Sequence, residues 1–257
     1  MFGKERQDKI YDMIRRNGAV STSKLVKLFN VSIETVRRDL LNMEKQGKLQ
    51  RVHGGAVAKG EMKPFLQLQE RNKENNPQKR SLSLKAMEFI SEGDTIAIDS
   101  GSTAIYFAEA LKEKFSRLTV VTHSIDVFNI LCRHGEFSVI LCGGHFNREE
   151  SAFYGALTLE TLGNLHIQKA FVCPSAISID YGICDYNHDL YLIQRQLISS
   201  SDEIYILADS SKFERKALLK ISEMKTEYTY ITDSLLYQEM EELYKENSIN
   251  IYKGEDQ

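Results

Sequence analysis

The sequence predicts an α/β fold in two parts, a short helical N-terminal module and a larger C-terminal domain built on a mostly parallel sheet. Three observations lead to this prediction. The chain has 257 residues, more than one small hydrophobic core usually needs. Its start carries an excess of Lys and Arg, whereas the remainder carries an excess of Asp and Glu. From Lys79 onward, apolar segments of strand length alternate with segments of helical periodicity, as in sheets covered by helices on both faces.

The composition is that of an ordinary globular protein. Hydrophobic residues make up 42 % of the chain and charged residues 27 %. No apolar run approaches the roughly 20 residues that cross a bilayer, and the polar start MFGKERQDKI does not resemble a signal peptide. We therefore expect a cytoplasmic protein without a membrane partner.

The cysteines do not follow a metal-binding pattern. They are Cys132, Cys142, Cys173 and Cys184. None of them forms a C-x-x-C pair, so a zinc site would have to combine them with His145, His166 or His188. Buried, reduced thiols explain the pattern better. We expect no metal ion and no cofactor.

Three helices are expected in the N-terminal module. They cover 4–16, a segment capped at Thr22 or Ser23 that runs to Phe29, and 32–47. Asn17-Gly18 ends the first helix because both residues tolerate a left-handed conformation. Ser32 caps the third helix through its hydroxyl.

Arg37 and Arg38 lie in the first turns of the third helix, where a recognition helix carries the side chains that read bases. Neighbouring side chains on a helix point in different directions, so one guanidinium could pair with guanine while the other holds a phosphate. Glu34 and Asp39 could orient them. The alternative is a solvated basic surface without a partner.

The segment LQRVHGGAV after Gly47 is typical of two short strands joined by a tight turn at Gly54-Gly55. Arg51 and His53 make this hairpin basic. A hairpin of this kind is a wing that lies against the sugar-phosphate backbone or the minor groove.

The string VSIETVRRDLLNMEKQGKLQRVHGGAV resembles the signature of the DeoR family, in which a Val-Ser turn, a Thr-x-Arg-Arg-Asp-Leu helix and a Gly-Gly wing recur in this order and spacing. The resemblance implies a winged helix-turn-helix over 1–57 that binds a double-stranded DNA operator. The helix that begins at Ser32 would enter the major groove. The implied DNA contacts are Ser32, Thr35, Arg37 and Arg38, with Lys24, Arg51 and the wing residue His53 near the backbone.

A polar connector is expected over 58–78, with Pro64, Pro77 and a partly helical stretch around 66–73. The C-terminal domain then covers 79–257. Its expected strands are 95–99, 118–122, 138–142, 169–173, 204–209, 228–232 and 249–252. Its expected helices are 80–91, 103–114, 124–134, 156–165, 188–200 and 235–246.

The run Asp99-Ser100-Gly101-Ser102-Thr103 follows the first of these strands and opens a helix. Gly101 allows a ligand to approach the backbone, and the hydroxyls and free N–H groups of the helix start make a cradle for an anion such as phosphate. The run is not a Walker loop. An ordinary strand–helix turn with a serine cap is the alternative.

Other strand ends meet at the same edge of the sheet, where ligands of parallel α/β proteins bind. His123 and His145 could contact hydroxyl groups, although each alone is more often a turn residue. Gly143-Gly144 suits close backbone approach. Lys212 follows a buried strand and could bind phosphate, or it could be a solvated loop lysine.

These pieces resemble the sensor domain of the DeoR family, which is similar in fold to ribose-5-phosphate isomerase, over roughly 79–235. The resemblance implies that the loop at 100–103 holds the phosphate of a sugar and that Lys212 lies in the same pocket. The expected effector-binding residues are Asp99, Ser100, Gly101, Ser102, Thr103, His123, Gly143, Gly144, Arg195 and Lys212.

The sequence departs from the isomerases where they need acidic groups to move a proton between sugar carbons. Pro174–Ser178 contains no carboxylate, and the next one is Asp180. We therefore expect binding without turnover, and no catalytic residue.

The sequence also departs from typical sensors of the family. Ala176 stands where they usually have glycine, and Leu192 and Gln194 stand where they often have an acidic residue and a lysine. Arg195 could restore some of the missing positive charge.

We expect a DNA-binding regulator, by resemblance a repressor of carbohydrate genes that a phosphorylated sugar releases from its operator. Because paired half-sites about 34 Å apart are usually met by dimers, a homo-oligomer (dimer or tetramer) is expected. Activation remains an alternative, and so do a ligand-independent DNA-binding protein whose C-terminal domain only oligomerises and a sugar-phosphate isomerase.

Overall fold

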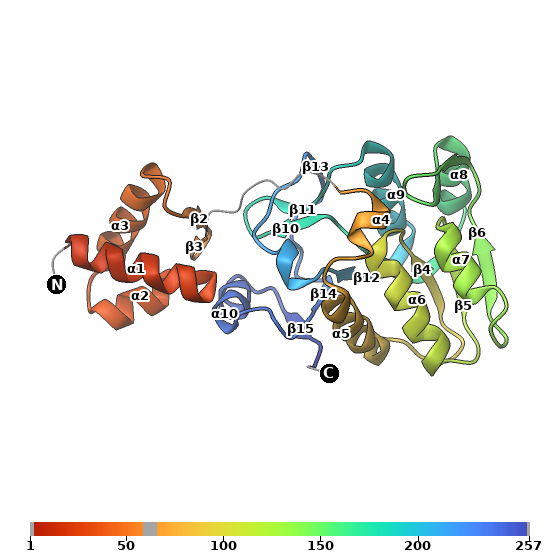
Figure 1. Cartoon of the computed structure of the whole chain (residues 1–257), viewed down its shortest axis with the longest axis horizontal. Helices are drawn as coiled ribbons and strands as arrows, with labels where there is room; N and C mark the ends of the chain where they lie inside the picture. The colour runs from red at the N-terminus through yellow and green to blue at the C-terminus, as the bar shows by residue number, and fades with distance from the viewer. Residues whose placement is uncertain (1–2, 59–65, 256–257) are drawn as a thin grey trace.

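The computed structural model describes residues 3–58 and 66–255, which form a small N-terminal module and a larger α/β domain (Figure 1). The predicted connector falls partly on residues 59–65, including Pro64, which lie outside the described residues. Residues 66–78 of the predicted connector carry helical segments that are described below with the α/β domain.

The N-terminal module combines three helices with a small antiparallel sheet. Its elements are α1 (Gly3–Asn17), β1 (Ala19–Ser21), α2 (Thr22–Phe29), α3 (Ile33–Lys45), β2 (Gln50–Val52) and β3 (Gly55–Val57). The strand order is β1-β3-β2, so the predicted wing gains a third strand from the link before α2. Ile14, Leu25, Val36 and Leu40 are buried together between the helices. The module is the predicted winged helix-turn-helix.

Serine hydroxyls begin two of these helices. The side chain of Ser32 accepts a hydrogen bond from the backbone N–H of Thr35, as expected for the cap of α3. The cap of α2 is Ser21, which accepts from the N–H of Lys24, and not Thr22 or Ser23. The helix thus begins one residue earlier than the sequence indicated.

The segment predicted as a connector carries α4 (Leu68–Arg71) and the first turn of α5 (Asn76–Ala86). Pro77 lies in the first turn of α5, where the N–H group that proline lacks has no helical partner. The 3-10 turn η1 (Met87–Phe89) continues α5 toward the sheet. The chain therefore joins the α/β domain well before Lys79.

Seven parallel strands form the central sheet, in the order β15-β14-β12-β9-β4-β5-β6. Each of them overlaps one of the predicted strands. They are β4 (Thr95–Ile98), β5 (Thr119–Thr122), β6 (Ser138–Leu141), β9 (Ile167–Val172), β12 (Ser201–Leu207), β14 (Thr229–Thr232) and β15 (Ile251–Lys253). The central strands are buried because helices cover both faces of the sheet.

The covering helices divide into two groups by the core that they enter. They are α6 (Ser102–Lys114), α7 (Ile125–Leu131), α8 (Ala156–Gly163), α9 (His188–Ser199) and α10 (Gln238–Glu246), together with α5. Leu82, Phe107 and Val127 place α5, α6 and α7 on one core. Leu162 and Leu243 place α8 and α10 on the other, which α9 also enters. No helix formed by the described residues has the length and apolar character of a membrane span.

Short antiparallel strands that the sequence did not predict follow the carboxyl ends of the sheet. One hairpin pairs β7 (His145–Asn147) with β8 (Ala152–Tyr154). A second small sheet has the order β10-β11-β13. Its strands are β10 (Ala176–Ser178), β11 (Gly182–Asp185) and β13 (Leu219–Ser222), and the 3-10 turn η2 (Ser210–Lys212) precedes β13.

The N-terminal module contacts the α/β domain through α10 and the turn between β10 and β11 (Figure 1 shows α10 beside the module). Lys24 Nζ lies 3.4 Å from Glu239 Oε1. The N–H of His53, at the wing tip, donates to Asp180 Oδ1 at 2.8 Å, and Asn247 Nδ2 donates to the His53 carbonyl at 3.1 Å. The wing tip therefore touches both elements.

Candidate DNA-binding surface and effector pocket

The residues predicted to read bases lie together on the N-terminal half of α3. Ser32 is exposed at the cap, Thr35 is half-buried, and Arg37 and Arg38 are exposed. None of the ion pairs formed within residues 3–58 and 66–255 involves either arginine. Their guanidiniums are thus available to bases or phosphates, which is the arrangement that DNA recognition by α3 requires.

Asp39 does not orient these arginines, contrary to expectation. It is buried and accepts hydrogen bonds from Arg6 Nε and from Gln7 Nε2 of α1, the latter at 3.1 Å. Successive side chains on a helix point about 100° apart, so Asp39 faces inward while Arg37 and Arg38 face solvent. The Arg6–Asp39 pair fixes α3 against α1, on the side of α3 opposite the exposed Arg37 and Arg38.

The three residues predicted near the DNA backbone have different surroundings. Lys24 lies between Glu239 and Glu242 of α10, at 3.4 and 3.8 Å. Arg51 lies on β2, and its N–H donates to Glu44 Oε1 at 2.8 Å. His53 is exposed at the wing tip beside the α/β domain. In this arrangement Lys24 and His53 lie next to the larger domain.

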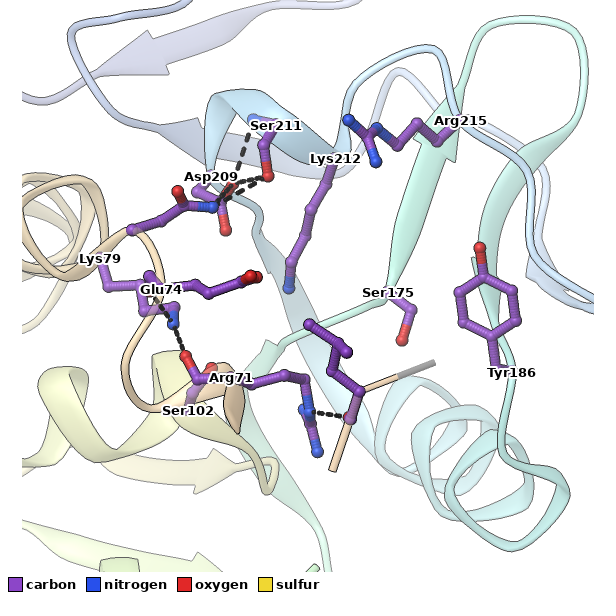
Figure 2. A pocket seen from close by; sticks show the side chains of 12 residues that line it. Arg71, Glu74, Lys79, Ser102, Ser175, Tyr186, Asp209, Ser211, Lys212 and Arg215 are labelled. Carbon is purple, nitrogen blue, oxygen red and sulfur yellow. Dashed lines mark hydrogen bonds between the residues drawn. The ribbon is translucent and has the colours of Figure 1, made fainter. Parts of the chain in front are cut away.

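A cavity of about 290 Å³ opens beyond the carboxyl ends of β4, β9 and β12 (Figure 2). Its lining comes from the region of α4 and α5, the start of α6, and the loops after β9, β11 and β12. The lining residues are Leu66, Arg71, Glu74, Asn75, Lys79, Ser102, Ser175, Tyr186, Asp209, Ser211, Lys212 and Arg215. The cavity thus lies at the edge of the sheet where the sequence analysis predicted a ligand site.

Two of the predicted effector-binding residues line this cavity. Ser102 is the first residue of α6, and Lys212 ends η2 with its side chain directed into the cavity (Figure 2). Lys212 Nζ donates to the Pro174 carbonyl at 2.8 Å. Gly101 precedes α6 with φ +105°, a left-handed conformation that favours glycine. A Cβ at Gly101 would lie 3.2 Å from the guanidinium of Arg71, so the backbone at Gly101 closely approaches this cation of the cavity.

Arg71 and Lys79 are cavity residues that sequence reasoning missed. Arg71 Nε donates to the Leu66 carbonyl at 3.0 Å, and its guanidinium pairs with the buried carboxylate of Glu150. Lys79 is buried and donates to the carbonyls of Arg71 and Glu74. Burial, with Lys212 and Arg71 nearby, lowers the pKa of Lys79 to about 8. Both residues were overlooked because Arg71 lies within the polar segment expected to be a connector and Lys79 directly follows it.

The lining carries more positive than negative charge. Its cations are Arg71, Lys79, Lys212 and Arg215, and its acidic residues are Glu74 and Asp209. Ser102, Ser175 and Ser211 add hydroxyl groups to the lining. Cations beside hydroxyls and the start of a helix suit a ligand that bears both an anionic group and polar groups.

Asp99 and His123 lie beneath the cavity and do not line it. Both are fully buried. Asp99 accepts hydrogen bonds from the N–H groups of Ser100 and Cys173 at 2.7 and 2.9 Å, and His123 Nε2 lies 3.3 Å from Asp99 Oδ1. These bonds hold the loop before α6 in place, so in this structure Asp99 and His123 support the loop and do not reach the cavity.

Ser100 and Thr103 are likewise buried, and their hydroxyl oxygens have no hydrogen-bond partner among the described residues. The hydroxyl of Tyr154 is also buried, and it lies close enough to the Ser100 hydroxyl to interact with it, although outside normal hydrogen-bond geometry. Buried polar atoms normally find partners. Two of these hydroxyls, those of Ser100 and Thr103, belong to the loop before α6 and the first turn of that helix.

Gly143, Gly144 and Arg195 do not line the cavity. The Gly143 carbonyl accepts a hydrogen bond from Thr158 Oγ1 at 3.0 Å. A Cβ at Gly144 would lie 2.2 Å from Thr158 Oγ1. Gly144 therefore allows the loop after β6 to pack against α8, whereas a Cβ at Gly143 would meet open space. Arg195 is exposed and donates to the hydroxyl of Tyr191 on its own helix.

Gln194 bridges two buried carboxylates. Its Nε2 lies 2.9 Å from Asp99 Oδ2 and 3.4 Å from Asp185 Oδ2. Burial and, among smaller effects, the charge of Asp99 raise the pKa of Asp185. Ala176 is buried on β10, and Leu192 is half-buried on α9. None of Gln194, Ala176 and Leu192 lines the cavity.

Asp185 lies beside the cavity lining and is already engaged by its neighbours. Asp185 is buried, and its carboxylate already accepts hydrogen bonds from Ser175 and from the N–H groups of Tyr186 and Asn187. Among the described residues, no group of His, Cys, Asp and Glu side chains could hold a metal ion. Three of the cysteines are buried and Cys132 is half-buried.

Both parts of the chain match models of known protein families. A DeoR-like helix-turn-helix domain matches residues 6–61, and a DeoR C terminal sensor domain matches residues 74–234. Similar proteins include a putative aga operon transcriptional repressor of Escherichia coli O157:H7, 31 % identical over 84 % of this chain and 81 % of that protein. An L-fucose operon activator of Haemophilus influenzae is 30 % identical over 95 % of this chain and 97 % of that protein.

A lactose phosphotransferase system repressor of Lactococcus lactis is 32 % identical over 91 % of this chain and 92 % of that protein. Both family matches describe parts of a regulator and not of an enzyme. The chain therefore belongs to the DeoR family of transcriptional regulators.

Proposed function

We propose that the chain represses carbohydrate genes by binding an operator through α3, and that a phosphorylated sugar bound in the cavity releases it. The observation that carries the proposal is the cationic cavity at the start of α6, formed by Arg71, Lys79, Ser102 and Lys212. Two of the similar proteins are named as repressors and one as an activator, and two of the three names refer to a sugar, L-fucose or lactose. The experiment below tests whether the phosphorylated sugar releases the chain from DNA. If the sugar instead makes the chain bind DNA more tightly, the chain acts as an activator.

The DNA-binding part of the proposal rests on α3. Ser32, Thr35, Arg37 and Arg38 would approach base edges, and Arg51 would approach the backbone. We propose a dimer or tetramer, since one small module buries too little surface for tight discrimination between sequences. Two copies would present their α3 helices to half-sites about 34 Å apart.

The DNA contacts can be tested on duplexes selected by the full-length chain from a random pool. Arg37→Ala and Arg38→Ala should each weaken binding about 5- to 150-fold, measured by fluorescence anisotropy. Lys45→Ala, at the exposed far end of the same helix, is the matched control and should change affinity little. Binding that survives both arginine variants would refute the assignment of α3.

The effector can be tested with a panel of phosphorylated sugars and their unphosphorylated counterparts. Only a phosphorylated member should release the selected duplex. Lys212→Met should retain DNA affinity and lose release, because it removes a cation from the cavity. Arg195→Met is the control, since that guanidinium lies outside the cavity and bonds to Tyr191. Release by the unphosphorylated sugars, or by none of the panel, would overturn the effector part of the proposal.

A further inference from the structure

The loop from Ser210 to Arg215 lines two hollows of the molecule. Ser211, Lys212 and Arg215 line the effector cavity. The same loop also lines a second hollow of about 380 Å³, through Ser210, Phe213 and Glu214 and again through Ser211 and Arg215, together with residues of the N-terminal module and of the α10 region. The module contributes Gly18, Val57 and Ala58 to this hollow. One short loop therefore separates the effector cavity from the junction between the two domains.

Glu214 holds this loop to the α/β domain on the side away from the effector. Its side chain is 4 % exposed, and its backbone has φ +51°, a strained conformation for a residue other than glycine. Glu214 Oε1 accepts hydrogen bonds from the hydroxyl of Tyr244 at 2.6 Å and from the N–H of Ile179 at 3.0 Å. The neighbouring Phe213 ring packs edge-on against the Tyr244 ring. Two hydrogen bonds and an aromatic contact thus fix the loop.

Both partners of Glu214 belong to elements that contact the N-terminal module. Tyr244 lies on α10, which also carries Glu239, the partner of Lys24. Ile179 lies in the turn between β10 and β11, and the next residue, Asp180, accepts the N–H of His53 at the wing tip. The carboxylate of Glu214 is therefore bonded to each of the two elements on which the module rests.

We propose that Glu214 is the positioning residue that couples the effector cavity to the placement of the DNA-binding module. An anion would attract Lys212 and Arg215 and shift their loop. Glu214 is buried and accepts two hydrogen bonds. A shift of the loop therefore also moves Tyr244 on α10 and Ile179, the neighbour of Asp180. The contacts with Lys24 and His53 then change, so the effector favours a different placement of α3. This inference rests on the proposed function and names how its site is regulated.

The coupling between the two sites is the quantity to measure. The affinity for the selected duplex is measured with and without inorganic phosphate, and with and without the phosphorylated sugar that releases the wild type, at constant ionic strength. The affinity for each probe is measured separately by thermal shift. In the wild type a saturating probe should weaken DNA binding at least fivefold.

Tyr244→Phe removes the hydroxyl that bonds to Glu214 and keeps the buried ring. We expect DNA affinity and probe affinity each to stay within about twofold of wild type, while the weakening by the probe falls to less than twofold. Glu214→Ala should behave in the same way, and Glu214→Gln should retain the coupling because an amide oxygen still accepts both bonds. Tyr205→Phe, which breaks a Tyr–Glu bond to Glu203 elsewhere in the sheet, is the matched control and should keep full coupling.

The outcomes separate the coupling from the function on which it rests. A wild type that binds neither probe contradicts the proposed effector site. A wild type that responds, with Tyr244→Phe responding equally, overturns the role of Glu214 alone. If Glu214→Ala does not fold, Tyr244→Phe decides the question. Loss of coupling in Tyr205→Phe as well would show a general loosening of the domain and would also overturn the proposal.

Discussion

Lys24 of α2 lies with its Nζ 3.4 Å from Glu239 Oε1 of α10, so a cation expected at the DNA backbone is held by the larger domain. Glu242 lies 3.8 Å from the same nitrogen. If Lys24 contacts the DNA backbone as expected, these two carboxylates would compete with a phosphate for its ammonium group.

Replacing both acidic residues, in Glu239→Gln/Glu242→Gln, should raise DNA affinity because Lys24 is then free to meet phosphate. Exposed ion pairs are worth about 0.2–1 kcal/mol, so a gain of about two- to fivefold is expected. Fluorescence anisotropy over a range of salt concentrations measures it. Glu241→Gln, which removes the partner of Lys253 on the same helix, should leave DNA affinity near wild type. Weaker DNA binding by the double variant would show that the pair holds α3 in the productive orientation.

The buried pair of Arg6 and Asp39 should matter for stability and not for base reading. Asp39→Asn removes the carboxylate charge from the buried Arg6–Asp39 pair, so the unfolding free energy of the module should fall by about 1–3 kcal/mol. Urea unfolding followed by circular dichroism measures the loss. Glu34→Gln, exposed in the first turn of the same helix, should leave stability unchanged. If the Asp39→Asn variant is as stable as wild type, the Arg6–Asp39 pair does not contribute to the stability of the module.

The main elements could be predicted because their signals are local. The seven strands of the central sheet are apolar runs with breaks between them, and the cap of α3 is a serine before a helical pattern. The strands β10, β11 and β13 gave no such signal. They are three or four residues long, and β11 pairs with β13 far along the chain, for example Cys184 with Lys220. Their formation depends on tertiary pairing that no local pattern encodes.

The lining of the cavity could be predicted in part for the same reason. Ser102 and Lys212 follow buried strands, so the topology of a parallel sheet brings them to one edge. Arg71 and Lys79 come from a polar stretch that resembled a connector, and only the packing of α4 and α5 against the α6 loop brings them to the cavity. Asp99 and Gln194 look like ligand groups by type, but they bond to each other beneath the cavity.

Glu214 should make the α/β domain less stable as the pH rises. Burial raises the pKa of its carboxyl to about 7; the charge of Asp180 acts in the same direction, while the bonds from Tyr244 and Ile179 and the charge of Lys216 oppose it. A raised pKa gives a stability contribution that is full below the unfolded value near 4.3 and is lost as the pH rises through 7. Between pH 5.5 and 8.0 the loss should be about 2 kcal/mol.

Glu214→Gln removes this titration, so the difference in unfolding free energy between wild type and variant isolates it from the other buried carboxyls. Urea unfolding at the two pH values measures the difference. The same change at the exposed Glu223 provides the control, since it should alter neither value. A difference between wild type and Glu214→Gln that does not vary with pH would show that Glu214 does not titrate in this window.

Gln194→Lys should stabilise the α/β domain at high pH by placing a charge between Asp99 and Asp185. The neutral amide now bridges two buried carboxylates, and the pKa of Asp185 is raised by burial and by Asp99. An ammonium group there lowers the pKa of Asp185, and a lowered carboxyl pKa contributes stability above the unfolded value that is lost on acidification. We expect a gain on the order of 1 kcal/mol at pH 8, which corresponds to a tenfold increase in the acidity of Asp185, and a smaller gain at pH 5.

Thermal unfolding of Gln194→Lys at both pH values measures this gain. Gln194→Met, which fills similar space without a donor, should instead destabilise the domain, most at pH 8, because the two carboxylates then face each other unbridged. If the lysine variant melts below wild type at pH 8, the cost of burying the ammonium exceeds the attraction, and the amide is the better bridge in this chain.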